Sequence, residues 1–89
     1  MRKLYTVSHT TRATGIRRVT IARWFQEGRV EGAFRIGRGT RGGRWYAEAD
    51  PIFACLLADG WKASEKDTKN ALEQERLREM EKKGQKTNA

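Results

Sequence analysis

The stretch SHTTRATGIRRVTIARWFQEG, from Ser8 to Gly28, carries the strongest fold signal in this chain. A serine can cap a helix start, and Gly15 can take the positive φ that ends a helix. The pattern therefore predicts a first helix from Ser8 to Gly15 and a second from about Arg18 to Glu27, ended by Gly28. Two short helices joined by a tight glycine turn are typical of small domains that present one helix to the DNA major groove.

At 100° per residue, the second helix divides into an apolar face and a polar one. Ile21, Trp24 and Phe25 fall on the apolar face, which must point toward a core. The other face and its flanks combine arginine, which suits guanine, with glutamine, which suits adenine, and with an apolar group for the thymine methyl. The side chains predicted to contact DNA are Arg18, Val19, Thr20, Arg23 and Gln26.

A strand pair is predicted next. AFRIG at 33–37 alternates apolar and polar residues, so Phe34 and Ile36 are expected to point inward, and RWYA at 44–47 is the expected partner strand. Glycines at 37, 39, 42 and 43 predict a flexible hairpin tip, or wing, that approaches a partner closely. Arginines there suit phosphate or a narrow minor groove. The wing residues predicted to contact DNA are Arg35, Arg38, Arg41 and Arg44.

The rest of the chain changes character near Trp61. Asp50-Pro51 predicts the start of a third helix, with Asp as its cap, and Gly60 ends it. Its predicted buried side consists of Ile52, Phe53, Leu56 and Leu57. Residues 1–61 are therefore predicted to form one winged helix-turn-helix domain, mainly α with a small β-hairpin. Residues 62–89 are predicted to be a charged tail, helical or disordered, with a candidate helix over 64–83 whose apolar residues are too sparse to pack a core alone.

Length and composition limit the possible functions. Eighty-nine residues with a net charge of +8 suit one small domain with an anionic polymer or surface as its partner. One cysteine, Cys55, excludes an intrachain disulfide. With His9 as the one histidine, a four-ligand Cys/His zinc site is also excluded, and His9 is expected to be exposed at a helix start. Trp24 and Trp45 are expected in the core.

Other function classes find no support in the residues. No apolar run approaches the ~18 residues of a membrane span. The residues show no nucleophile–base pair, carboxylate cluster or metal-binding spacing, and the GRGTRGG loop lacks the lysine of a phosphate-binding loop. We therefore expect no enzyme, no catalytic residue, no metal and no cofactor. A cytoplasmic location in a bacterial host, associated with the nucleoid, is expected.

The motif R-x-T-[IV]-x-R-W-[FI]-x-E-G-R-[VI], from Arg18 to Val30, together with YTVS at 5–8 and Gly15, resembles the excisionases. These are small recombination directionality factors of phages and mobile elements, with a winged helix-turn-helix related to the MerR-type DNA-binding domain. The resemblance covers about residues 4–60. It places Thr20 and Arg23 at polar positions of the recognition helix. The chain departs from the family at Arg17, where many members have a capping Ser or Thr.

The resemblance implies a protein that binds repeated sites in an attachment-site arm, bends the DNA and directs an integrase toward excision. Its implied partners are double-stranded DNA, an integrase or recombinase, further copies of itself on the DNA and a host DNA-bending protein. Two alternatives remain open at this point. One is a winged-helix transcriptional regulator, such as a repressor, and the other is a phage DNA-packaging adaptor.

Overall fold

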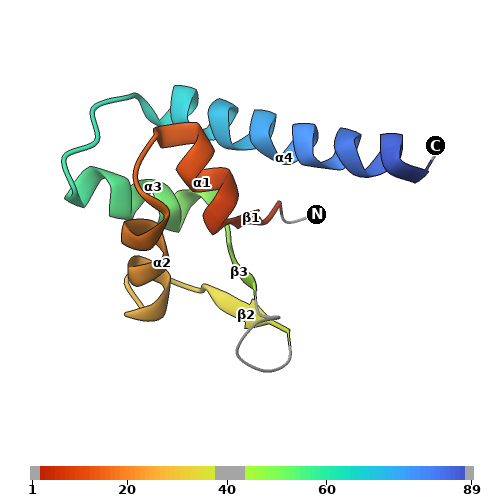
Figure 1. Ribbon diagram of the computed structural model, residues 1–89. Helices are drawn as coiled ribbons and strands as arrows, with labels where there is room; N and C mark the ends of the chain where they lie inside the picture. Colours follow the sequence, from red (N-terminus) through yellow and green to blue (C-terminus); the bar gives the residue numbers. More distant parts are fainter. Residues whose placement is uncertain (1–2, 38–43, 88–89) are drawn as a thin grey trace.

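Four helices and three short strands follow one another in the computed structural model, which describes residues 3–37 and 44–87 (Figure 1). The predicted wing contacts Arg38 and Arg41 lie outside the described residues. The elements are β1 (Tyr5–Thr6), α1 (Val7–Thr14), α2 (Arg18–Gln26), β2 (Phe34–Ile36), β3 (Arg44–Ala47), α3 (Ala49–Ala58) and α4 (Glu65–Thr87). The expected mainly-α class is confirmed.

The sheet has three antiparallel strands in the order β1-β3-β2, so it is larger than the predicted hairpin. In the central strand β3, Ala47 pairs with Tyr5 of β1, and Tyr46 pairs with both Thr6 of β1 and Phe34 of β2. The segment before the first helix is therefore tied into the sheet by backbone hydrogen bonds. This pairing fixes the start of α1 beside the strands that flank the predicted wing.

The helices and β1 enclose one core. Its most deeply buried large apolar side chains come from three different helices: Ile21, Phe25, Ile52, Leu56 and Leu72. Leu72 belongs to α4, which lies along α1 and α3, while the C-terminal turns of α4 extend past the rest of the fold (Figure 1). The tail is thus helical over Glu65–Thr87, and its first half supplies part of the core.

Several local predictions are corrected by the structure. The first helix begins at Val7 and is capped by Thr6, so Ser8 lies inside the helix rather than capping it. The third helix begins at Ala49, with Glu48 as its cap residue, which places Asp50 in its first turn. Helix bounds can shift by a residue or two at either end. The Thr6 cap is therefore a firmer correction than the start of α3, because hydrogen bonds between Thr6 and His9 define it, whereas Glu48 makes no capping bond.

The inward orientation predicted for Phe34 and Ile36 is wrong, because these side chains are 40% and 58% exposed. They belong to β2, one of the two edge strands of the sheet. Phe34 instead stacks on Tyr46 of β3, with ring centroids 5.9 Å apart.

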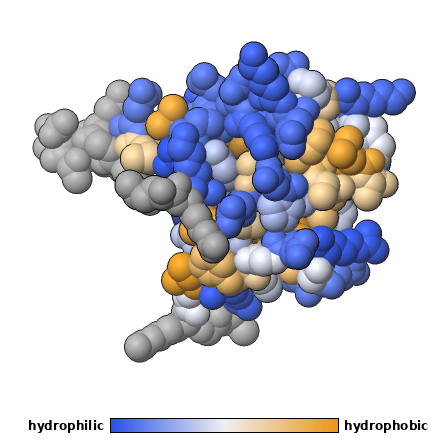
Figure 2. Space-filling model, turned by 180° about the vertical axis from the view of Figure 1, so that it is seen from behind, coloured by the Kyte–Doolittle hydropathy of each residue, from blue (hydrophilic) through white to orange (hydrophobic). Residues whose placement is uncertain are grey.

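In α3, Ile52 and Leu56 are buried as predicted, but Leu57 is 52% exposed. Seen from behind, the surface is mainly hydrophilic, with small hydrophobic patches (Figure 2).

Candidate nucleic-acid interface

Helix α2 has the two faces that its sequence predicts. Ile21, Trp24 and Phe25 are buried in the core, which confirms the apolar face. On the opposite side, four of the five predicted contact residues are exposed and the fifth, Thr20, is half-buried. The exposed four are Arg18, Val19, Arg23 and Gln26. The structure therefore leaves four of the predicted recognition residues exposed on a helix whose apolar face is fixed by packing.

The arginines of α1 and α2 have no ionic partner within the described part of the chain. Arg12, Arg17, Arg18 and Arg23 are all exposed, and none forms an ion pair with another described residue. Neither helix contains an aspartate or glutamate that could supply such a partner. Each guanidinium keeps five N–H donors in a planar fork that matches phosphate geometry. This surface can therefore contact an anionic polymer without first breaking internal ion pairs.

The start of α2 adds to this positive character. Its cap residue, Arg17, makes no side-chain capping bond, and the first turn holds no acidic residue. The positive end of the helix dipole is thus not offset by a carboxylate of that turn. The sequence indicated this, because Arg17 stands where a Ser or Thr could cap the helix.

The strands that flank the wing contribute two more exposed arginines, Arg35 and Arg44. Arg44 Nη1 donates a hydrogen bond to Glu79 Oε1 of α4 over 3.2 Å, while its side chain stays 58% exposed. The packing of Trp45, the next residue in β3, supports this position. Trp45 is half-buried and packs against the core. The centroids of its ring and the Phe25 ring are 6.2 Å apart.

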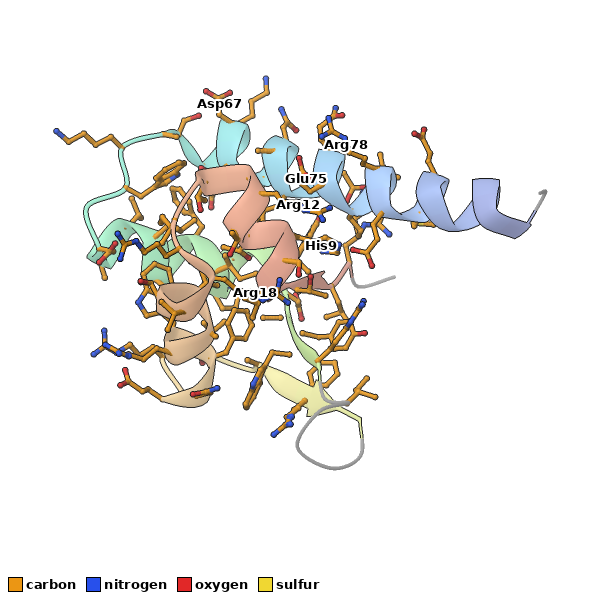
Figure 3. All side chains as sticks on the ribbon, viewed as in Figure 1. His9, Arg12, Arg18, Asp67, Glu75 and Arg78 are labelled. Atoms are coloured by element: carbon orange, nitrogen blue, oxygen red, sulfur yellow. The ribbon has the colours of Figure 1, made fainter. Side chains whose placement is uncertain are left out.

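A hollow of about 170 Å³ lies between the start of α1, α2 and β3. Its lining includes Ser8, Arg18, Ala22, Arg44 and Trp45. It therefore joins an arginine of the predicted recognition helix to an arginine at the base of the predicted wing. In Figure 3, Arg18 projects from α2 toward the start of α1, on the side of the molecule where β3 runs.

His9 is buried, so the expectation that it is exposed is wrong. Its Nδ1 accepts a hydrogen bond from the Thr6 backbone N–H over 3.1 Å, while Thr6 Oγ1 accepts from the His9 N–H over 3.2 Å. These two bonds form a capping box in which histidine takes the place of the usual Glu or Gln. Because Nδ1 accepts, the neutral ring carries its proton on Nε2, which lies 2.7 Å from Glu79 Oε2.

Glu79 thus links three elements: its two oxygens reach His9 of α1 and Arg44 of β3 from α4. Burial raises the pKa of this carboxyl, but the bonds from His9 and Arg44 outweigh burial and lower it overall. Sequence reasoning missed Glu79. The Thr6–His9 spacing contained the signal for the capping box, but nothing local indicates a partner 70 residues away.

A second carboxylate of α4, Glu73, holds the N-terminal segment. It accepts hydrogen bonds from Arg76 over 2.7 and 2.9 Å and from the Tyr5 hydroxyl over 2.9 Å, and Lys3 lies 3.5 Å away. The Arg76 bonds, opposed by burial and helped by Tyr5, lower the pKa of Glu73 to about 2. Burial, with the bond to Glu73, raises the pKa of Tyr5 to about 12. Tyr5 therefore stays a neutral donor to an ionised carboxylate.

Comparison of the chain with protein-family models, curated proteins and solved structures found no match. Among the residues that the structure describes, no helix is both long and apolar enough to cross a membrane. The functional interpretation therefore depends on the sequence motif and on the geometry of this surface.

Proposed function

We propose that this chain is a DNA-bending protein of the excisionase type, which binds attachment-site DNA and directs an integrase toward excision of a phage or mobile element. In this proposal its fold is a winged helix-turn-helix: α2 enters the major groove, and the hairpin of β2 and β3 lies along the adjacent minor groove or backbone.

The observation that carries the proposal is the exposed polar face of α2. Arg18, Arg23 and Gln26 face outward from a helix whose opposite side is held by Trp24 and Phe25 in the core. A helix fixed on one side, with arginine and amide groups exposed on the other and no ion-pair partner for those arginines among the described residues, suits the reading of base edges. The exposed Val19, at 64%, is suited to contact with a thymine methyl.

The arrangement of the other elements supports the same proposal. Helices α1 and α2 are joined at Gly15, whose φ of +76° is the left-handed conformation of a helix-ending turn. The paired strands β2 and β3 follow, with Arg35 and Arg44 exposed on them. Helix and hairpin lie on the same side of the fold in Figure 1, so both could reach one duplex.

The net charge of +8 and the unpaired arginines favour phosphate contacts as a large part of the affinity. In the proposal, base contacts from α2 supply the sequence preference, and contacts from α2 and the hairpin to backbone hold the DNA in a bent form. The integrase, further copies of this chain and a host DNA-bending protein are the proposed partners in the complex.

The test is a gel-shift titration on circularly permuted fragments of the source element's attachment site. We expect discrete complexes whose mobility depends on the position of the site, because several copies bend the DNA. Addition of the integrase from the same element should then raise excision of a supercoiled substrate. Tight binding at one promoter without bending would identify a transcriptional regulator instead. Equal, salt-sensitive binding to every fragment would rule out the excisionase.

A further inference from the structure

The hollow between α1, α2 and β3 differs from the rest of the proposed interface because it joins the two elements that would enter neighbouring grooves. Arg18 lines it from α2, and Arg44 lines it from the base of the wing. The major and minor grooves of a duplex are separated by one sugar-phosphate strand. If α2 lies in one groove and the wing in the next, the hollow faces that strand.

The lining of this hollow suits a phosphodiester group. Two arginines come from different elements, Ser8 adds a hydroxyl, and none of the described residues that line it is acidic. Ala22 and Trp45 are among the uncharged residues of its walls. A volume of about 170 Å³ leaves room for a tetrahedral phosphate with its ester oxygens. Guanidinium groups bind such oxygens through two parallel N–H bonds.

The position of Arg44 is set from outside the hollow by α4. Glu79 Oε1 accepts from Arg44 Nη1, while Glu79 Oε2 is held at 2.7 Å by the buried ring of His9. Among the described residues only Glu79 accepts from Arg44, so the guanidinium, which has five N–H donors, can offer others to an anion. Glu79 therefore orients the Arg44 guanidinium through a hydrogen bond from Nη1.

We propose that this hollow binds one backbone phosphate of duplex DNA between Arg18 and Arg44, and that Glu79 on α4 is the positioning residue for Arg44. The inference rests on the proposed DNA-binding function and deepens it. It makes α4 part of the DNA-binding apparatus, although α4 itself contacts no DNA in this arrangement.

The first experiment measures binding to a fluorescent 20-bp duplex, enriched from a random library by the full-length protein, over a range of salt concentrations. Each phosphate contact contributes about 0.9 to the slope of log K against log salt. Because Arg18 and Arg44 share one phosphate, the double variant R18A/R44A should lose about 0.9 in slope. A loss of about 1.8 would mean two separate phosphates and would overturn the inference.

R78A is the matched control, since Arg78 is 64% exposed on α4 and its removal deletes an arginine charge outside the hollow. We expect its slope to match that of the unaltered protein. If each deleted arginine lowered the slope equally, so that R78A lost about half as much as the double variant, bulk charge would explain the result and the site would be overturned. Failure of the unaltered protein to bind any duplex would overturn the proposed function itself, whereas normal binding with unchanged slopes in the arginine variants overturns the inference alone.

The role of Glu79 is tested by E79Q against E81Q, which makes the same charge change at an exposed position of the same helix. Either change raises the net charge by one and should strengthen DNA binding if charge alone matters. In glutamine one of the two acceptor oxygens becomes an NH2 donor, which would face either the Nε2–H of His9 or the Nη1 of Arg44 and cannot accept from it. We therefore expect E79Q to weaken binding, by about threefold, while E81Q does not.

Two further readouts separate positioning from a loss of folding. In an R44A background, E79Q should cause no additional loss of affinity, because the residue that it positions is absent. Thermal unfolding followed by circular dichroism should show E79Q folded at the temperature of the binding assay. Equal strengthening by E79Q and E81Q, or an undiminished effect of E79Q in R44A, would remove Glu79 from the site.

Discussion

Helices α1 and α2 use their basic residues in a different way from helix α4. Within the described part of the chain, Arg12, Arg17, Arg18 and Arg23 have no ion pair, and the sequences VSHTTRAT and RVTIARWFQ contain no carboxylate. In α4, by contrast, basic side chains pair with carboxylates three or four residues away in the same helix. The difference indicates that the first two helices are suited to an external anion, whereas the charges of α4 act within the chain.

The pairing in α4 reaches beyond the helix itself. Lys69 contacts Asp50 of α3, Glu73 contacts Tyr5 of β1, and Glu79 contacts His9 of α1. The exposed pair Lys69–Asp50 contributes little stability by itself, whereas the contacts with Tyr5 and His9 are partly buried. Their main effect is to fix how α4 lies over α1 and the sheet, together with the burial of Leu72 beneath it.

The largest expected effect is a loss of stability in a variant of Leu72, and it tests whether α4 belongs to the core. Leu72 is fully buried, so Leu72→Ala should lower the free energy of unfolding by about 2–5 kcal/mol, through lost burial and a cavity. Urea denaturation followed by circular dichroism measures this. Leu77→Ala is the control, because Leu77 is 44% exposed on the same helix and its truncation should cost well under half as much. Equal small effects would mean that α4 is detached in solution.

The unpaired arginines give the next effect. Replacing Arg23 by Ala should weaken binding to the selected duplex by about 1–3 kcal/mol and relax the preference for one base position. Competition with single-base variants of that duplex measures both quantities. Arg78→Ala, which removes a paired arginine from α4, should change neither. A uniform loss across all sequences would make Arg23 a phosphate contact rather than a base contact.

A smaller effect concerns the capping box at the start of α1. Thr6→Ala removes the oxygen that accepts from the His9 N–H, and it should destabilise the fold by about 1 kcal/mol. Thr6→Ser keeps that oxygen and serves as the control for loss of the methyl group. Thermal unfolding of both variants gives the comparison. If Ala and Ser behave alike, the hydroxyl bond contributes nothing measurable and the cost belongs to packing.

Acid should weaken the contacts of α4 before it affects the arginine surface. Because Arg76 and Tyr5 hold the pKa of Glu73 at about 2, below its usual 4.5, Glu73 contributes stability at neutral pH. That contribution is lost as pH falls from about 4.5 toward 2. Urea midpoints over this range should fall less steeply for Glu73→Gln than for the unaltered protein. Parallel pH profiles would show that Glu73 adds nothing to the acid response.

Much of the fold could be predicted because its signals are local. The apolar side chains of α2 recur at helical spacing, and glycines mark the ends of α1 and α2 within a residue or so. The exposed polar face of α2 followed from the same periodicity. The prediction for Phe34 and Ile36 failed because alternation shows that a strand has two faces, but not whether either face is covered.

Spacing and composition alone were enough to specify the first three helices, the strand pair between the second and the third, the buried face of α2, and the separation of an arginine-rich part from a segment rich in both charges. Each of these depends on one segment at a time and needs no knowledge of the rest of the chain. Packing between distant segments decides instead that β1 joins the sheet, that His9 is buried, and that Glu79 reaches Arg44. Those features join residues 35 to 70 positions apart, and no local pattern encodes such a contact until the fold brings the segments together.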